Sequence, residues 1–277
     1  MESALDHRGA RALLEWHIEL GADECIQDSP INRYELPDTA PVSLRKVAAS
    51  VTTSQAKATP PRPQIIAPAQ IDAVAEAQHA AGQATDLAGL RAAMEGFAHC
   101  DLKRGARNFV FAAGQPGARV MIVGDAPGRD EDLEGKPFVG AAGHLLDRML
   151  AAIGLARDAD DPGQAVYVTN ALPWRPPQNR DPDAAEIAMM RPFLERHVAL
   201  VRPDLLILMG NHACEALLHR KGITRLRGTW AEAVGLPAMP MTHPEYLLRN
   251  PAAKREAWAD LLEVQARLAV TGGRRDR

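Results

Sequence analysis

Cysteine, aromatic residues and long apolar runs are all scarce in this chain of 277 residues. The three cysteines, Cys25, Cys100 and Cys214, lie far apart and form no Cys-x-x-Cys pair, so the sequence predicts neither a disulfide framework nor a cysteine-based metal site. Aromatic residues make up 4% of the chain, so we expect a core of Ala, Leu, Val, Ile and Met. No apolar run reaches the roughly 18 residues of a membrane-spanning helix, and the first residues lack the pattern of a secretory signal. We expect a cytoplasmic protein with no membrane partner.

The small net charge of −3 conceals an uneven distribution along the chain. Residues 1–40 contain nine acids and three arginines, about −6, so the remaining residues carry about +3. Within that remainder, basic residues gather around Arg175 and Arg180, over 220–227 and over 249–255. Loops of this kind can follow a phosphate backbone, but a solvated, arginine-biased surface has the same clustering. Charge alone therefore leaves both interpretations open.

The first 90 residues differ in character from the rest. Residues 8–20 have apolar residues at helical spacing, and residues 36–70 are rich in proline with few large apolar residues. An Ala-rich stretch over 71–97 predicts a further helix. We interpret the chain as three parts: an N-terminal extension (1–90) made of a helix, a Pro- and Ala-rich linker and a helix, a folded domain (91–270), and a flexible tail (271–277).

From about residue 118 the sequence alternates between short apolar runs and amphipathic stretches. Four runs of strand length predict strands buried on both faces, over 118–124, 165–172, 204–210 and 237–244. The stretches that follow them predict helices over 143–154, 183–201, 211–219 and 251–269. Strands that alternate with helices indicate a parallel sheet covered on both faces. The predicted fold is a three-layer α/β/α sandwich with a central, four-stranded, mainly parallel sheet.

In such folds, ligands bind in the crevice at the carboxyl ends of the strands. Four distant segments should converge there: Gly124–Gly128, Asn170–Trp174, Gly210–His212 and His243–Leu247. The GDAPG turn at the first strand end has the glycine spacing of neither a phosphate loop nor a dinucleotide-binding turn. What remains is a tight turn with one acid, Asp125, which can act in chemistry or simply cap a helix.

The other polar residues at these strand ends also have two interpretations. Asn170 can satisfy loop backbone, or its amide, with one acceptor and two donors, can read the edge of a nucleobase. His243 taken alone is an ordinary polar residue. Residues 244–249 are expected to form a loop that joins apolar side chains to a cation, which suits a wedge between stacked bases. Phe138 would by default belong to the core.

Four motifs together resemble the family-4 uracil-DNA glycosylases of the uracil-DNA glycosylase superfamily. They are GDAPG…ED…GKPFVG (124–140), VYVTN with RPP-x-NR (166–180), ITRLRG (223–228) and HPEYLLR (243–249). They occur in the family's order and at the predicted strand ends, and the resemblance covers about residues 97–268. It implies an enzyme that hydrolyses the N-glycosidic bond between uracil and deoxyribose in DNA, which begins base-excision repair.

The resemblance also implies roles for individual residues, once uracil has been flipped out of the base stack. Asp125 would orient the attacking water, and His243 would donate to O2 of the departing uracil anion. Phe138 would stack on uracil, and the amide of Asn170 would read N3–H and O4, which excludes cytosine. Gly124, Ala126 and Gly128 would line the rest of the uracil pocket. The residues expected to contact DNA are Arg175, Arg225, Arg227, Tyr246, Leu247 and Arg249.

Two departures from the family pattern bear on these expectations. Family-4 enzymes usually bind a [4Fe–4S] cluster through four cysteines, and the matching positions here are Phe97, Cys100, Trp174 and Met190. One thiolate cannot hold such a cluster, so we expect no iron–sulfur cofactor and no metal, with apolar packing in its place. Second, Asp125 stands where the family has glutamate, and its side chain is one methylene shorter.

Two rival functions stay open. The first is a glycosylase for another deaminated base, such as hypoxanthine or xanthine, or an enzyme that traps the abasic sugar covalently, because Gly128 is too small to exclude wider bases. The second is a non-catalytic protein that binds damaged or single-stranded DNA, with Asp125 an inactive replacement. We expect a monomer that acts on uracil-containing DNA, single- or double-stranded.

Overall fold

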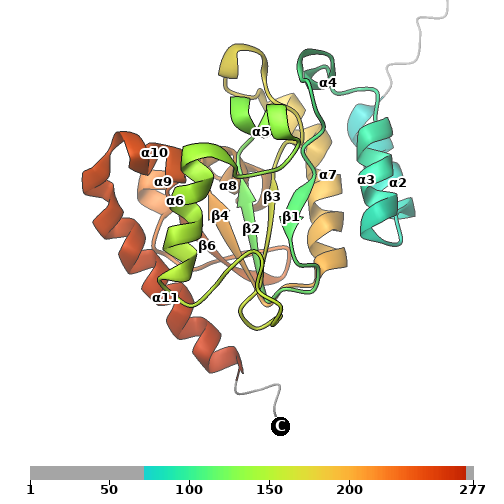
Figure 1. The fold of residues 1–277 in the computed structure, drawn as a ribbon. Helices are drawn as coiled ribbons and strands as arrows, with labels where there is room; N and C mark the ends of the chain where they lie inside the picture. The colour runs from blue at the N-terminus through green and yellow to red at the C-terminus, as the bar shows by residue number, and fades with distance from the viewer. Residues whose placement is uncertain (1–71, 273–277) are drawn as a thin grey trace, which may run out of the picture. The chain divides into compact units, whose positions relative to one another are not determined.

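The computed structural model of the chain describes residues 72–272 (Figure 1). The helix expected over 8–20, the Pro-rich linker over 36–70 and most of the expected tail lie outside the described residues. Within the described part, no helix is both long and apolar enough to cross a membrane.

A six-stranded sheet in the order β1-β3-β2-β4-β6-β5 forms the core. Its four inner strands are parallel: β2 (Val120–Gly124), β3 (Val166–Asn170), β4 (Leu205–Met209) and β6 (Leu236–Met241). Every residue of β2, β3 and β4 is buried, because helices cover both faces of the sheet. The four apolar runs therefore form the parallel strands that they predict, and the α/β/α fold is confirmed.

Two strands of three residues each extend this sheet at its edges. β1 (Ala112–Gly114) pairs antiparallel with β3, and β5 (Ala231–Ala233) pairs antiparallel with β6. Three residues are too few to show the alternation by which a strand is recognised in a sequence. The complete sheet is therefore mixed, with a parallel centre and antiparallel edges.

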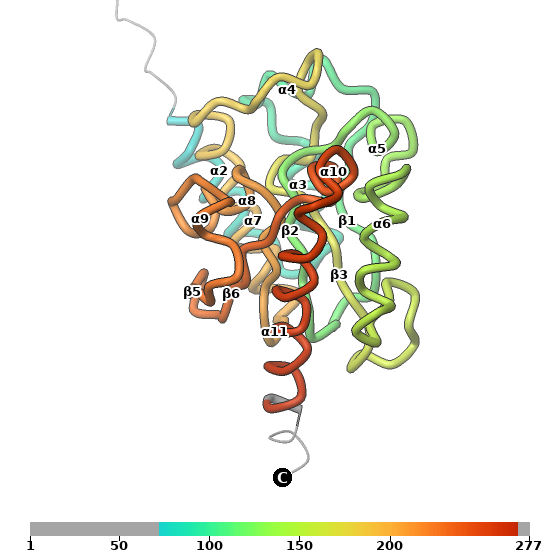
Figure 2. The backbone as a smooth tube through the Cα atoms, turned by 90° about the vertical axis from the view of Figure 1, so that its left-hand side faces the viewer, coloured from blue at the N-terminus to red at the C-terminus, as the bar shows by residue number. Residues whose placement is uncertain are grey.

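Helices cover the two faces of the sheet in separate layers (Figures 1 and 2). One face packs against α7 (Ala184–Val201) and α8 (Asn211–Leu218), and the other against α6 (Gly140–Ala151) and α11 (Lys254–Gly272). Successive residues of a strand point to opposite faces, so β2 contributes Met121 to the first layer and Ile122 to the second. The resulting core is almost entirely aliphatic, as the composition predicts.

The remaining helical elements are short. They are α4 (Leu102–Gly105), α5 (Arg129–Glu134), the 3-10 turn η2 (Pro177–Asn179), α9 (Ile223–Leu226), α10 (Pro244–Arg249) and the 3-10 turn η3 (Pro251–Ala253). Figure 2 shows α5 and α10 at the same end of the sheet. The segment 244–249, expected as a loop, is thus a helix, because proline is readily accommodated at a first helical position.

Two more helices, α2 (Ala73–Gln83) and α3 (Leu87–Gly96), pack against α7 on the side that faces away from the sheet. Each begins at an aspartate, Asp72 or Asp86, that accepts backbone hydrogen bonds from the first turn. Their buried residues join Phe193 of α7 in one hydrophobic cluster. Residues 73–90, which the sequence places in the N-terminal extension, thus pack with the α/β domain.

The long helix α7 begins where its sequence predicts. Asp183 accepts a hydrogen bond from the backbone N–H of Glu186 (2.8 Å), and Glu186 accepts one from that of Asp183 (2.9 Å). This capping box satisfies donors that the first turn leaves unpaired. Arg180 pairs with the same carboxylate of Glu186, with Nη2 2.6 Å from Oε1. The cap thereby ties the RPPQNR segment to the helix that follows it.

Candidate active site

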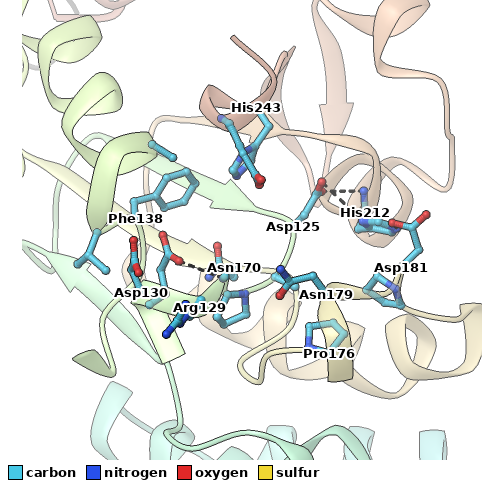
Figure 3. A pocket seen from close by; sticks show the side chains of 18 of the residues that line it. Asp125, Arg129, Asp130, Phe138, Asn170, Pro176, Asn179, Asp181, His212 and His243 are labelled. Carbon is cyan, nitrogen blue, oxygen red and sulfur yellow. Dashed lines mark hydrogen bonds and ion pairs between the residues drawn. The ribbon is translucent and has the colours of Figure 1, made fainter. Parts of the chain in front are cut away.

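A cavity of about 520 Å³ opens at the carboxyl ends of the parallel strands. Residues that follow β2, β3, β4 and β6 line it, so the four segments expected to converge do so (Figure 3). Its lining includes Asp125, Phe138, Asn170, His212, His243 and Leu248. Ala126 and Gly128 also border the cavity, whereas Gly124, expected to line it with them, is buried and is not part of the lining.

Asp125 both borders this cavity and caps a helix. Its Oδ1 accepts hydrogen bonds from the backbone N–H groups of His212 (2.7 Å) and Ala213 (2.8 Å), in the first turn of α8. A helix N-terminus offers unpaired donors and a partial positive charge, which favour a carboxylate there. The side chain remains one-quarter exposed. The two interpretations of Asp125 are therefore compatible, because the N–H groups of the helix bond to Oδ1 and not to Oδ2.

His212 is a site residue to which the sequence assigns no role. Its Nδ1 lies 3.6 Å from Oδ2 of Asp125, and its Nε2 lies 3.9 Å from Oδ1 of the exposed Asp181. The adjoining carboxylate of Asp125 raises the pKa of His212 above its ordinary value, although burial opposes this. The sequence feature that points to His212 is its position two residues after Gly210, at the end of a predicted strand.

His243 begins α10 and faces the cavity between Phe138 and Asp125 (Figure 3). Its Nδ1 accepts a hydrogen bond from the backbone N–H of Glu245 (3.3 Å), so the neutral ring carries its proton on Nε2. Burial lowers the pKa of His243 below its ordinary value, which favours this neutral form. The ring therefore offers an N–H donor to the cavity without carrying a positive charge.

Phe138 and Asn170 form the other side of the cavity. Phe138 is 3% exposed, and its ring stacks on that of His243 with centroids 5.4 Å apart. Asn170 ends β3 and is 6% exposed, yet its side-chain amide has no hydrogen-bond partner among residues 72–272. The amide borders the cavity, so its two donors and its acceptor are open to a bound ligand.

Gly124 explains how these two side chains come together. A Cβ atom at this position would lie 2.5 Å from Oδ1 of Asn170 and 2.6 Å from Cζ of Phe138. Real Cβ atoms do not approach so closely, so any larger residue would displace the amide or the ring. The glycine of the GDAPG turn thus shapes the pocket by absence of a side chain.

The three acids after this turn have separate tasks. Asp132 is buried and accepts hydrogen bonds from the backbone N–H groups of Arg107 (2.8 Å) and Asn108 (3.1 Å), which fixes the segment before β1. Glu131 accepts a hydrogen bond from the backbone N–H of Gly128 (3.0 Å), and burial raises its pKa. Asp130 is exposed at the cavity rim.

One of the expected DNA contacts, Leu247, needs correction. Leu247 is fully buried and packs against Leu145 and Ala257, because in helix α10 its side chain points to the core. The exposed apolar residues of α10 are instead Tyr246 and Leu248.

Arg227 forms ion pairs with residues of α11. Its guanidinium pairs with Asp260 of α11, with Nε 2.9 Å from Oδ2, and contacts Glu256. These contacts fasten the ITRLRG segment to α11.

The other expected cations lie at or near the surface. Nε of Arg175 donates to Oδ1 of Asn179 (2.7 Å) across the turn η2, and Arg225 is exposed on α9. Arg249 borders the cavity and pairs with Glu245 one turn earlier in α10. These three arginines remain accessible to a ligand larger than the cavity.

The four positions that match the family's cluster ligands do come together. Phe97, Cys100, Trp174 and Met190 are buried in one hydrophobic cluster, beside Phe193. They supply a single thiol, and burial raises the pKa of Cys100 to about 11, which disfavours the thiolate that iron needs. Residues 72–272 contain no group of three or more His, Cys, Asp or Glu that could hold a metal ion. The side chains at this place therefore do not fit a [4Fe–4S] cluster.

Comparison with known proteins agrees with this geometry. Residues 111–262 match the model of the uracil DNA glycosylase superfamily. The chain is 38% identical over 176 residues to the type-4 uracil-DNA glycosylase of Archaeoglobus fulgidus, a match that covers 60% of this chain and 84% of the relative. It is 36% identical over 182 residues to the type-4 enzyme of Sulfurisphaera tokodaii, covering 62% and 80% of the two chains. It is 31% identical over 172 residues to the type-5 uracil-DNA glycosylase of Pyrobaculum aerophilum, covering 58% and 75%. The chain thus belongs to the uracil-DNA glycosylase superfamily.

Proposed function

We propose that this protein is a uracil-DNA glycosylase, which flips uracil out of DNA and hydrolyses its N-glycosidic bond. The observation that carries the proposal is the unpaired amide of Asn170, which borders the cavity together with Phe138, His243 and Asp125. The names of the curated relatives support the same activity.

Recognition of the base rests on the Asn170 amide and the Phe138 ring. The amide oxygen accepts from N3–H of uracil, and the amide nitrogen donates to O4. Cytosine has the reverse pattern at these atoms, so a fixed amide rejects it. Phe138 stacks on the flipped base, and Gly124 leaves room for ring and amide to meet one base at the same time.

His243 acts on the leaving group. As the C1′–N1 bond breaks, its electron pair passes to uracil, and negative charge grows on O2. The neutral imidazole, with its proton on Nε2, donates a hydrogen bond to that oxygen. A donor whose bond strengthens as charge develops stabilises the transition state more than the bound substrate.

Asp125 acts on the opposite partner of the reaction. As positive charge develops on the sugar, the attacking water forms the new bond to C1′ and passes its proton to Oδ2 of Asp125, from which it goes to solvent. Oδ2 of Asp125 orients this water and favours the cationic sugar, while Oδ1 stays fixed to α8. The helix contact holds the shorter side chain in one orientation.

DNA is the partner that these roles require. Arg175, Arg225 and Arg249 are placed to contact the phosphate backbone. Tyr246 and Leu248 are exposed beside the cavity, where they can fill the gap that the flipped base leaves. Leu248 takes the role that the sequence suggests for Leu247.

The proposed enzyme works without an iron–sulfur cluster. Phe97, Trp174 and Met190 supply no thiolate, so the protein should be colourless after anaerobic purification. Iron and sulfide analysis tests this directly. Stoichiometric iron, with the absorbance of thiolate–iron charge transfer, would overturn it.

The function is tested with oligonucleotides that contain one uracil, single-stranded and paired with guanine, in buffer without added metal. Release of uracil by the wild type, and its loss in Asn170→Ala, is the expected result. Matched strands with hypoxanthine or xanthine separate the first rival, and a protein–DNA adduct that survives denaturation identifies covalent trapping. Binding to uracil-containing DNA with no base released would favour the non-catalytic rival.

A further inference from the structure

The stacking residue Phe138 has a backbone conformation that phenylalanine rarely adopts. Its φ is +51°, in the left-handed region that disfavours residues with a bulky side chain. Such conformations persist only where the surrounding structure enforces them. The residues that enforce this one also determine where the ring stands in the pocket.

Arg157, in the connection between α6 and β3, makes the enforcing contacts. Its Nη1 donates to the carbonyl oxygens of Pro137 (3.3 Å) and Phe138 (3.0 Å). Its Nε and Nη2 donate to the two carboxylate oxygens of Asp147 on α6, at 2.7 and 2.6 Å. The planar guanidinium thus ties the backbone of the stacking residue to α6.

α6 approaches Phe138 at a second point. A Cβ atom at Gly143, in the first turn of α6, would lie 1.9 Å from the carbonyl oxygen of Phe138, so only glycine allows this approach. Further along the helix, Leu145 packs against Leu247 of α10, the helix that His243 begins. α6 therefore supports both of the rings that stack in the pocket.

We propose that Arg157 is a positioning residue, which sets the ring of Phe138 at the place and angle needed to stack on a flipped base. Arg157 does not line the cavity, so it acts through the backbone of Phe138. This inference rests on the proposed function, in which Phe138 is the stacking surface.

The first test uses the protein without DNA, so its outcome does not depend on the proposed function. Because the Phe138 ring stacks on His243, its ring current shifts the NMR signal of the Hε1 proton of His243. We expect Arg157→Gln to move this signal toward its position in Phe138→Ala. A signal that stays at the wild-type position would overturn the proposal.

A matched control removes a comparable ion pair away from the pocket. Nε of Arg119 donates to Oδ2 of Asp204 at 2.6 Å, where β2 and β4 begin. Arg119→Gln should therefore leave the His243 signal unchanged. Should Arg157→Gln fail to fold, Asp147→Asn takes its place, because it weakens the contact that anchors the guanidinium to α6 and so loosens its hold on the Phe138 backbone; the signal should move in the same direction by a smaller amount.

The second test asks whether the ring position matters to the base. Binding is measured to one strand with 2′-fluorodeoxyuridine, whose fluorine slows cleavage, and to a strand with an abasic analogue at the same place. We expect Arg157→Gln to weaken binding of the first strand about tenfold, within the range measured for base–aromatic stacking, and to leave binding of the second unchanged.

A double-mutant cycle decides the route by which Arg157 acts. If it acts only through the Phe138 ring, Arg157→Gln should have no further effect in a Phe138→Ala protein. Independent, additive losses would overturn the proposal. A wild type with no preference for the uracil strand would contradict the proposed function instead, and the NMR result would still decide the role of Arg157.

Discussion

The pocket and the hydrophobic cluster around Phe97 both match positions of the family's motifs, but they treat those positions differently. In the pocket the chemistry of the side chains is kept, and even Asp125, the one exchange, is another carboxylate. In the cluster three of the four ligand positions have become apolar, and the four side chains pack against one another. An iron–sulfur cluster that only stabilises a fold can be replaced by apolar packing. A side chain that contacts the substrate cannot be replaced in this way.

Substitution of two phenylalanines should separate the roles of the two regions most clearly. Phe97 and Phe138 are both nearly buried, one in the cluster and one in the pocket. We expect Phe97→Ala to lower the free energy of unfolding by about 3–5 kcal/mol while the folded enzyme keeps its rate. Phe138→Ala should lose less stability, because its ring borders a cavity, but should lose base binding. Urea unfolding and single-turnover excision below the unfolding transition measure the two effects. If Phe97→Ala abolished excision in a folded protein, the cluster would not be merely structural.

Within the pocket, the largest effect on rate is expected at His243. Losing one donor to a developing anion lowers the rate by about 10²–10³ in comparable sites. His243→Ala should lose this much single-turnover activity, at least as much as Asp125→Ala, with DNA binding nearly unchanged in both. Excision on a uracil-containing single strand, with fluorescence anisotropy for binding, measures them separately. A His243→Ala enzyme near the wild-type rate would remove the histidine from the mechanism.

Asp125→Glu and Asp125→Asn separate the catalytic role of the Asp125 charge from its role as a helix cap. Glutamate restores the family residue and should retain substantial activity. Asparagine keeps an oxygen that can accept from the N–H groups of α8, but it loses the charge. A large loss of rate with intact stability in Asp125→Asn would therefore assign the charge to catalysis and not to capping.

Asn170→Asp should change specificity as well as rate. The carboxylate cannot donate to O4 of uracil, but it can accept from the exocyclic amine of cytosine. We expect excision of uracil to fall by about tenfold or more, the value of one lost hydrogen bond to a buried group, and the preference for uracil over cytosine to shrink. Competition between uracil and cytosine strands measures both. Wild-type excision of uracil by this variant would make Asn170 a structural residue.

The sequence predicts the parts of this structure that depend on local pattern. Each inner strand is long enough to show an apolar run, and Asp183 caps α7 three residues from its partner. Contacts between distant residues are invisible to such patterns. Asp125 accepts a hydrogen bond from the backbone N–H of His212, which is 87 residues later in the sequence, and Arg227 pairs with Asp260, 33 residues later. The sequence therefore suggests the chemistry of Asp125 but not its helix contact, and it places Arg227 on DNA because nothing nearby reveals its partner.

Orientation on a short helix is a second limit. Neighbouring helical residues point about 100° apart, so the difference between Leu247 and Leu248 depends on how α10 lies on α6. That placement comes from the packing of Leu247 against Leu145, a contact between elements far apart in the chain. The sequence motif gives the residue types of segment 244–249, but only the packing of α10 determines which of its two leucines is exposed.

The smallest expected effect is a pH dependence located at the Asp125 end of the pocket. Asp125 raises the pKa of His212 in the folded protein, so the imidazolium stabilises the fold fully below the unfolded pKa of about 6.5 and less as the pH rises through the folded pKa. The free energy of unfolding of the wild type, minus that of His212→Gln, should therefore be largest in acid and shrink toward alkaline pH. For a contact at 3.6 Å we expect on the order of 1 kcal/mol or less.

Two other histidines affect the pH dependence of stability in the opposite direction to His212. Burial lowers the pKa of His197 to about 3 and also lowers that of His243, so both lower stability as the pH falls below about 6.5. Both histidines are present in the wild type and in His212→Gln, so their effects cancel when the two free energies of unfolding are subtracted.

Three acids face His212, namely Asp125, Asp181 and Glu215, and the first contributes most to its raised pKa. Asp125→Asn should therefore remove most of the pH dependence of the difference, measured by urea unfolding across the titration range. A difference that kept its full slope in Asp125→Asn would place the partner of His212 outside the proposed catalytic carboxylate.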